Sequence, residues 1–310
     1  MNINTIFKIL KLGRFHFPLA SLSVFSMGAL LAVLDGAKFY LDRFLLTYCV
    51  ILIVELVASY SNNYFDVNVD RYNEPETFSG GTRILLTDPV LLNFTRWLAI
   101  VLMVVSFILS TVFVVVFSFP ALFLVLVVSG GLLAWFYTAP PVRLSYRGLG
   151  EIAVMLAVGL LLPGTGYLVV ENSFAAPFWK FVLPALLYAL ALIINIEIPD
   201  WEGDHLGKKN TWVVLGGRSF GFLLTLLLPL LGTLYFFIIS DVSHLAGTTD
   251  NGLIAVFSLL PLGSAMLCFL KTSRGKTTDK SLVVRSAVAN VLSLILFVLI
   301  LDGYFVFLLN

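Results

Sequence analysis

Two groups of polar side chains close long apolar stretches of this chain, and both groups carry carboxylates. In the first group, Glu55, Ser59, Asn62, Asp66 and Asp70 follow one another at intervals of 4, 3, 4 and 4 residues. Successive residues of an α-helix turn by about 100°, so these intervals keep all five side chains on one narrow stripe. Acidic side chains at such depth are costly, and by default they mark a functional site. A helix end that simply enters water needs no such alignment.

The second group lies in the stretch NIEIPDWEGDHLGKKNTW (195–212). Glu197, Asp200 and Asp204 fall on one face if a helix continues through them. Pro199 has no N–H, so it predicts a kink and leaves the continuity of this face open. Both groups close their apolar stretches in the same way, and together they indicate a site more strongly than either does alone.

Facing carboxylates with nearby cations suit one kind of ligand. Carboxylate and amide oxygens suit Mg²⁺, which keeps waters or substrate phosphates as its other ligands. Carboxylates alone repel a diphosphate, whereas carboxylates bridged by Mg²⁺ hold it. The three histidines, His16, His205 and His244, are not clustered, so no zinc site is expected. The basic candidates to clamp the remaining phosphate oxygens are Arg71, Arg83, Lys208 and Lys209.

The elements that must position these residues are built for a membrane. Of the 310 residues, 59% are hydrophobic and 12% are charged, and the mean hydropathy is +1.00. A soluble domain carries about 25% charged residues, so the composition excludes a soluble enzyme. A membrane-spanning helix needs about 20 mostly apolar residues. The chain therefore predicts an all-α, polytopic membrane protein, a bundle of nine transmembrane helices at 17–36, 43–63, 95–117, 120–138, 150–170, 178–198, 219–240, 252–270 and 286–308.

Basic residues predict the orientation of this bundle. Placing the N-terminal segment (1–16) and every second connection on one side gathers 16 of the 19 lysines and arginines there. By the positive-inside rule, that side is cytoplasmic. We therefore expect a single domain over 1–310 in the cell membrane, with its active site facing the cytoplasm. The net charge of +1, without a basic patch interleaved with aromatic residues, argues against nucleic acid as a partner.

Acidic residues on two membrane helices also suit a different class of protein, a cation or proton transporter. In transporters, however, substrate and ion sites lie near the membrane midplane. The acids of this chain gather at one membrane face, so an enzyme that handles a diphosphate is the preferred interpretation. Mg²⁺-dependent release of diphosphate would separate the two classes.

Several segments resemble the UbiA superfamily of intramembrane prenyltransferases. The patterns Asn62-xxx-Asp66-xxx-Asp70 and Asp200-xxx-Asp204 are similar to the paired aspartate motifs of that family. The segment YTAPPVRLSYRGLGE (137–151) resembles its Tyr-x-x-x-Pro segment, and GKKNTWVVLGG (207–217) resembles its Gly-Lys-x-Thr segment. The likeness extends over nearly the whole chain and agrees with the nine helices that hydropathy predicts.

One branch of the superfamily is most similar to this chain. The segment SGGTRIL (79–85) resembles the menaquinone-type branch, which prenylates 1,4-dihydroxy-2-naphthoate. The chain departs from that branch at Glu197, Ile198 and Pro199, where paired Asn and an Arg are usual. Archaeal ether-lipid synthases share the same core.

The resemblance implies a Mg²⁺-dependent enzyme with two ions that bridge the diphosphate of a polyprenyl donor. It implies that the Asn62, Asp66 and Asp70 motif holds one ion and that Asp200 with Asp204 holds the second. Tyr137 would lie near the reacting allylic carbon. The residues left as candidates for phosphate or acceptor contacts are Arg71, Arg83, Lys208, Lys209, Arg143 and Arg147; the last two also suit the role of topology markers.

The implied acceptor is a lipophilic aromatic compound of the quinone- or phenazine-precursor kind. Its electron-rich carbon would attack the allylic carbocation left when diphosphate departs. The alternative is geranylgeranyl transfer to a glycerol-phosphate lipid, as in archaeal ether-lipid synthesis. The sequence does not distinguish the two acceptors.

Overall fold

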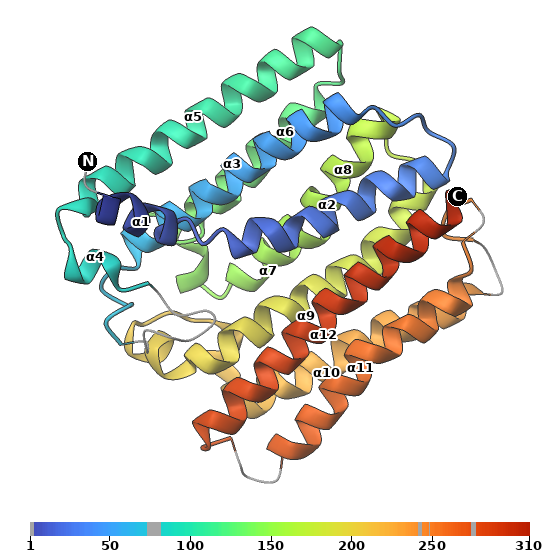
Figure 1. Ribbon diagram of the computed structural model, residues 1–310. Helices are drawn as coiled ribbons and strands as arrows, with labels where there is room; N and C mark the ends of the chain where they lie inside the picture. Colours follow the sequence, from blue (N-terminus) through green and yellow to red (C-terminus); the bar gives the residue numbers. More distant parts are fainter. Residues whose placement is uncertain (1–2, 73–81, 241–243, 248, 274–276) are drawn as a thin grey trace.

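The computed structural model describes residues 3–72, 82–240, 244–247, 249–273 and 277–310. All regular elements in these ranges are helices, as predicted (Figure 1). In chain order they are α1 (Ile3–Leu12), α2 (His16–Leu34), α3 (Leu41–Phe65), α4 (Ile84–Thr87), α5 (Leu91–Phe117), α6 (Leu122–Phe136), η1 (Leu144–Tyr146), α7 (Gly150–Leu156), η2 (Ala157–Leu161), α8 (Leu162–Glu171), α9 (Ala176–Leu206), α10 (Trp212–Ser240), α11 (Asn251–Thr272) and α12 (Lys280–Leu308).

The predicted membrane spans are confirmed in number and order over the described residues. Eight segments are long and apolar enough to cross a membrane: α2, α3, α5, α9, α10, α11, α12 and the composite Gly150–Glu171, which joins α7, η2 and α8. The ninth predicted span corresponds to α6, a shorter apolar helix. The chain is therefore an integral membrane protein with a helical bundle.

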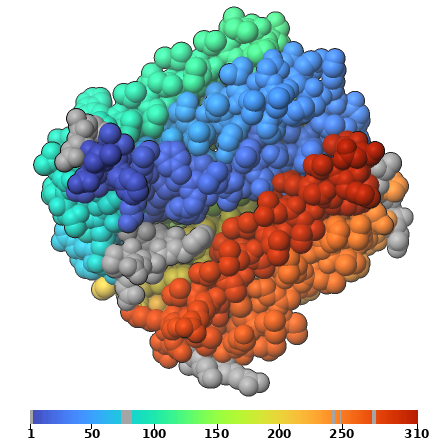
Figure 2. Space-filling view, viewed as in Figure 1, coloured from blue at the N-terminus to red at the C-terminus, as the bar shows by residue number. Residues whose placement is uncertain are grey.

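The bundle encloses α9 and leaves α5 on its outside. Of the apolar window of α9, 61% is buried, against 17% for α5, so α5 presents most of its surface to lipid. α9 packs against α10, α12 and α7, while α3 packs against α5 and α6. On the face drawn in Figure 2, α2 and α12 lie side by side. The ends of α3 and α9 that carry the two acidic groups thus belong to one packed unit.

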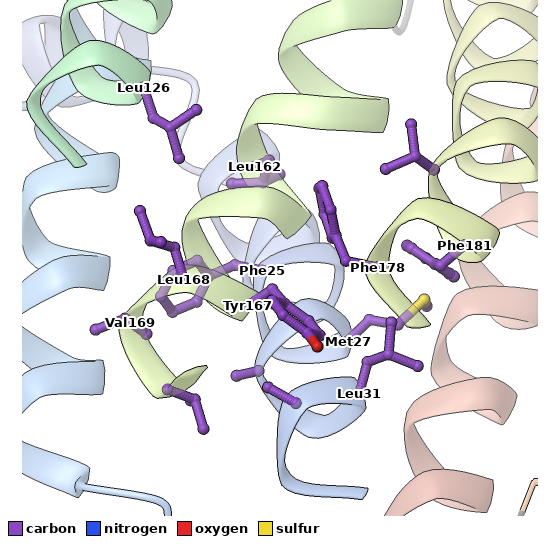
Figure 3. Packing of buried hydrophobic residues seen from close by; sticks show 14 of the residues in the cluster. Phe25, Met27, Leu31, Leu126, Leu162, Tyr167, Leu168, Val169, Phe178 and Phe181 are labelled. Carbon is purple, nitrogen blue, oxygen red and sulfur yellow. The ribbon is translucent and has the colours of Figure 1, made fainter. Parts of the chain in front are cut away.

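Aromatic and aliphatic side chains pack together where α2, α8 and α9 meet (Figure 3). Phe25 from α2, Tyr167 from α8 and Phe178 from α9 are each fully buried. The ring centroids of Tyr167 and Phe178 are 5.3 Å apart. Because lipid tails are as apolar as these side chains, close packing and not escape from water stabilises this contact.

The backbones of α2 and α8 approach each other closely at two glycines. A Cβ atom on Gly166 would lie 2.0 Å from the carbonyl oxygen of Phe25, and one on Gly28 would lie 1.9 Å from that of Pro163. No side chain fits at either distance. Small residues of this kind allow membrane helices to pack closely.

Gly166→Ala is expected to destabilise the protein by about 2–3 kcal/mol, because the added methyl group forces α2 and α8 apart. Thermal unfolding in detergent measures the effect. Gly303→Ala is the matched control, since a Cβ atom at Gly303 of α12 meets nothing within 4 Å. Equal melting temperatures for the two variants would show that the α2–α8 crossing tolerates the methyl group.

Prolines shape two helices that carry the site. Pro163 has no N–H to donate to the preceding turn, and the chain forms the π-helical turn η2 just before it. Pro199 lies inside α9, which continues through it as one helix to Leu206. Arg218 of α10 donates from Nε to the carbonyl of Ile198 at 3.3 Å, next to this proline. The second acidic group therefore lies on a continuous helix.

Candidate active site

A cavity of about 480 Å³ runs from the ends of α3 and α9 into the bundle. This volume lies in the range of about 300–1,000 Å³ that is typical of ligand pockets. Its polar end is lined by Arg14, Asn62, Asp66, Asp70, Tyr137, Glu197, Asp200, Asp204 and Lys209. The remainder is mainly apolar and includes Met27, Leu126, Phe181, Phe236, Phe297 and Leu301. The cavity thus offers a charged end and a long apolar space to the same ligand.

The first acidic group reaches the cavity from the end of α3. The helix ends at Phe65, but the N–H of Asp66 donates to the carbonyl of Asn62 and that of Asp70 to the carbonyl of Asp66, each at 2.9 Å. The turn after α3 therefore keeps the helical spacing. All five residues of the predicted stripe line the cavity.

The second acidic group reaches the same cavity from α9. Glu197, Asp200 and Asp204 all line it, as expected for residues on one face of an unbroken helix. Asp204 and Glu197 are 5% exposed. The structure therefore brings together both groups that the sequence singled out.

Lys209 lies between the two acidic groups. Its Nζ atom is 2.7 Å from Oδ2 of Asp66 and 3.6 Å from Oδ1 of Asp204. Burial lowers the pKa of Lys209, but the carboxylates of Asp66 and Asp204 outweigh this effect and raise it well above its ordinary value. One buried ammonium group thus links α3 to α9.

Hydrogen bonds orient the oxygens of the first group. The hydroxyl of Tyr146 donates to Oδ1 of Asp66 at 2.7 Å, and the hydroxyl of Thr138 donates to Oδ1 of Asn62 at 2.9 Å. Burial and the neighbouring Asp66 raise the pKa of Asp70 to about 6. Both hydroxyl donors come from the connection between α6 and α7, which therefore helps to build the site.

Of the six basic candidates, Lys209 is the one that lines the cavity among the described residues. The others lie outside its lining: Arg71, Arg83, Arg143, Arg147 and Lys208. Arg83 donates to the backbone carbonyls of Asp70 and Arg71. The guanidinium of Arg143 lies 3.8 Å from the ring centroid of Tyr146. Arg83 therefore contacts the backbone of the first acidic group. Arg143 contacts Tyr146, which donates a hydrogen bond to Asp66.

Arg14 is a residue of the site that no sequence pattern indicated. It lies between α1 and α2 in a left-handed conformation (φ 47°), lines the cavity, and is attracted by Asp70, Asp200 and Asp66. In the sequence, it counted only as one of the basic residues that set orientation. Its nearness to the acids depends on the packing of the N-terminal segment, for which no local spacing gives a signal.

Glu151 also has a role that the sequence did not indicate. An acid at the start of the fifth span is favourable for the helix dipole, yet Glu151 is fully buried. Its Oε1 atom accepts the backbone N–H of Trp212. The indole of Trp212 donates to the carbonyl of Gly148 at 3.1 Å. Together these bonds fasten the turn that carries Lys209 to the start of α7.

The donor set of the polar end suits a hard cation that brings other ligands with it. In the described ranges, no three His, Cys, Asp or Glu side chains gather closely enough to hold a metal ion alone. Mg²⁺ does not need such a cage, because it is usually bound by one or two carboxylates together with waters and substrate phosphates. The carboxylate and amide oxygens at the cavity therefore fit Mg²⁺ that arrives with a phosphorylated ligand.

Comparison with known proteins identifies the family. The UbiA prenyltransferase family model matches residues 21–290. No curated protein matches the sequence.

Solved structures share the fold. A UbiA homolog from Archaeoglobus fulgidus bound to DMAPP and Mg²⁺ has a TM-score of 0.68 at 14% identity, with 93% of this chain and 99% of that chain covered. A digeranylgeranylglyceryl phosphate synthase has a TM-score of 0.64 at 18% identity, with 96% of this chain and 99% of that chain covered. A UbiA homolog from Aeropyrum pernix K1 has a TM-score of 0.62 at 16% identity, with 91% of this chain and 98% of that chain covered. Since the family model spans most of the chain, this membrane protein belongs to the UbiA prenyltransferase family.

Proposed function

We propose that this prenyltransferase moves a polyprenyl group from its diphosphate to a lipophilic aromatic acceptor, a quinone or phenazine precursor. One observation carries the proposal: the acids of both motifs converge at the polar end of a cavity whose remainder is apolar. A prenyl diphosphate has this same division between a charged end and a long apolar tail. Family membership in turn favours an enzyme over the transporter.

The polar end is the proposed diphosphate site. Asn62, Asp66 and Asp70 would hold one Mg²⁺ ion, and Asp200 with Asp204 a second. When bound, Mg²⁺ neutralises charge on the departing diphosphate. Homologs from Archaeoglobus fulgidus with this fold were solved with DMAPP and Mg²⁺ and with GPP and Mg²⁺, which supports this class of ligand.

The residues of the chain position the donor and shield the reaction. Lys209 and Arg14 add positive charge that stabilises the leaving group as the allylic C–O bond breaks. The apolar walls hold the tail and exclude water from the carbocation. Tyr137 lines the polar end, where its ring face can stabilise a nearby cation. The other basic candidates, Arg71, Arg83, Lys208, Arg143 and Arg147, lie outside the cavity lining and are given no role in the transfer.

A second acceptor class has its own support. The fold is also that of a digeranylgeranylglyceryl phosphate synthase, and the chain departs from the menaquinone-type pattern at Glu197. Transfer of a geranylgeranyl group to a glycerol-phosphate lipid is therefore the alternative. Both reactions use the same donor site and differ only in the group that attacks.

A purified-protein assay with labelled prenyl diphosphates and a panel of acceptors tests the proposal. We expect diphosphate release and product formation with Mg²⁺, loss of both when EDTA is in excess, and recovery when Mg²⁺ is restored. Alkylation of glycerol-phosphate lipid but of no naphthoate, benzoate or phenazine acceptor would establish the alternative. If no donor releases diphosphate in a Mg²⁺-dependent way, the proposed site is wrong.

We further propose that the active site faces the cytoplasm of the cell, since most lysines and arginines lie on its side of the bundle. The same assay in sealed vesicles checks this. Inside-out vesicles should consume prenyl diphosphate added outside, and right-side-out vesicles should leave it intact. The opposite pattern would reverse the orientation.

A further inference from the structure

Two buried carboxyl groups adjoin each other at the wall of the cavity. Glu197 of α9 lines the cavity and is 5% exposed, and Glu151 of α7 is fully buried. Glu151 is near enough for electrostatic interaction with Glu197. Neither oxygen of Glu197 has a hydrogen-bond partner in the described part of the chain, and Oε2 of Glu151 has none there either.

The oxygens of Glu197 lack the donors that would stabilise a carboxylate. No serine, lysine or backbone donor meets them in the described ranges. A carboxylate without such donors binds a proton more strongly than one held by an ammonium group or by hydrogen bonds. Glu197 is therefore suited to accept a proton from a ligand.

Glu197 lies at the depth where the chemistry must occur. It precedes Asp200 by one turn of α9 and Asp204 by two turns, on the side away from the helix end. If those aspartates hold the diphosphate, the first carbon of the tail would lie deeper in the cavity, towards Glu197. Tyr137 lies near enough for electrostatic interaction with Glu197.

We propose that Glu197 is a catalytic residue that accepts the proton lost by the acceptor, and that Glu151 is the positioning residue that holds it. The allylic C–O bond of the donor breaks, and its electron pair leaves with the diphosphate. An electron pair of the acceptor forms the new bond to the allylic carbon. The proton then passes from the attacked ring carbon, or from a hydroxyl, to the carboxylate of Glu197, and its bonding pair stays with the acceptor.

The inference rests on the proposed prenyl transfer but not on which acceptor is used. An aromatic carbon and a lipid hydroxyl both lose one proton when they are prenylated. The other acids at the polar end are less suited, because Asp66 and Asp204 already bind the ammonium group of Lys209. Among the residues that the structure describes, Glu197 is the buried acid with both oxygens unengaged by such donors.

Glu197→Gln tests the role, because it keeps the size of the side chain and removes its ability to accept a proton. Transfer to the acceptor should fall about 10²-fold. Mg²⁺-dependent diphosphate release without acceptor, where water captures the prenyl group, should stay within about threefold of wild type. The C–O bond breaks before any proton is lost, and the capturing water can then lose its proton to solvent. Deuterium at the attacked ring position should slow the variant but not the wild type.

Matched variants keep the result interpretable. Glu202 lies on the same helix and pairs with Arg218 and Lys280 outside the cavity. The Glu202→Gln variant should therefore transfer the prenyl group at the wild-type rate. Glu197→Asp keeps the carboxylate and should recover part of the rate, which also shows that a folded protein was measured. Glu151→Gln should lower transfer less than Glu197→Gln does.

The outcomes separate the inference from the proposed function. If wild type releases no diphosphate, the proposed function fails. If wild type is active and Glu197→Gln transfers equally well, the inference is overturned. It is also overturned if Glu197→Gln stops diphosphate release and excess Mg²⁺ restores it, because Glu197 would then be a metal ligand.

Discussion

Asp66→Asn is expected to lower the rate of prenyl transfer by about 10³-fold or more, with the fold retained. Asparagine has the same shape and can still accept the hydroxyl of Tyr146, which donates to Oδ1 of Asp66. It carries no charge, however, so it loses the ion pair with Lys209 and the attraction to the proposed Mg²⁺. Such a loss corresponds to about 4 kcal/mol of transition-state stabilisation. Single-turnover product formation at saturating donor measures the effect.

Asp88→Asn is the control for this prediction. Asp88 pairs with Lys8 at 3.0 Å, is partly exposed, and lies outside the cavity. Exposed ion pairs contribute about 0–1 kcal/mol, so this variant should keep activity within about twofold. If Asp66→Asn retains more than about a tenth of wild-type activity at millimolar Mg²⁺, the first motif does not hold the metal.

Much of the fold is predictable from hydropathy, because a helix that crosses a bilayer must be long and apolar and must satisfy its own backbone hydrogen bonds. The predicted spans match the observed helices in order, but several helices extend further at the polar ends. α9 continues to Leu206 where the predicted span ended at 198, and α10 begins at Trp212 where 219 was expected. Apolar windows stop at the first charged residues, whereas a helix continues as long as its backbone hydrogen bonds are made.

The two acidic motifs were predictable for a related reason. The spacing of residues along a helix determines which of them share a face, and this does not depend on the surroundings of the helix. In both motifs that shared face lines the cavity. The sequence left the continuity of the helix at Pro199 open, and α9 continues through it because packing inside the bundle outweighs the local cost of proline.

The long-range members of the site were not predictable in this way. Arg14 lies far from the motifs along the chain and reaches the cavity only after the helices pack. Glu151 likewise meets Trp212 only through packing. Lys208 and Lys209 are neighbours in an irregular turn, so periodicity cannot tell which one points inward. The left-handed conformation of Lys208 (φ 58°) leaves its side chain exposed, while Lys209 reaches the acids.

Lys209→Met is expected to have two effects of opposite sign. Prenyl transfer should fall by about 10²- to 10³-fold, because the variant loses a buried cation beside the departing diphosphate. Binding of Mg²⁺ without donor should become tighter, because Asp66 and Asp204 lose the ammonium group that neutralises them. Turnover assays and calorimetric titration of the donor-free protein with Mg²⁺ measure the two effects separately.

Lys208→Met is the matched control, since it removes the same charge from the adjacent, exposed position. It should leave both transfer and Mg²⁺ binding within about twofold of wild type, as expected for a solvated surface charge. Lys209→Arg should not restore full activity, because the planar guanidinium cannot replace a compact ammonium group between two carboxylates. If both methionine variants lose activity equally, then the charge of the turn matters and the position of Lys209 between α3 and α9 does not.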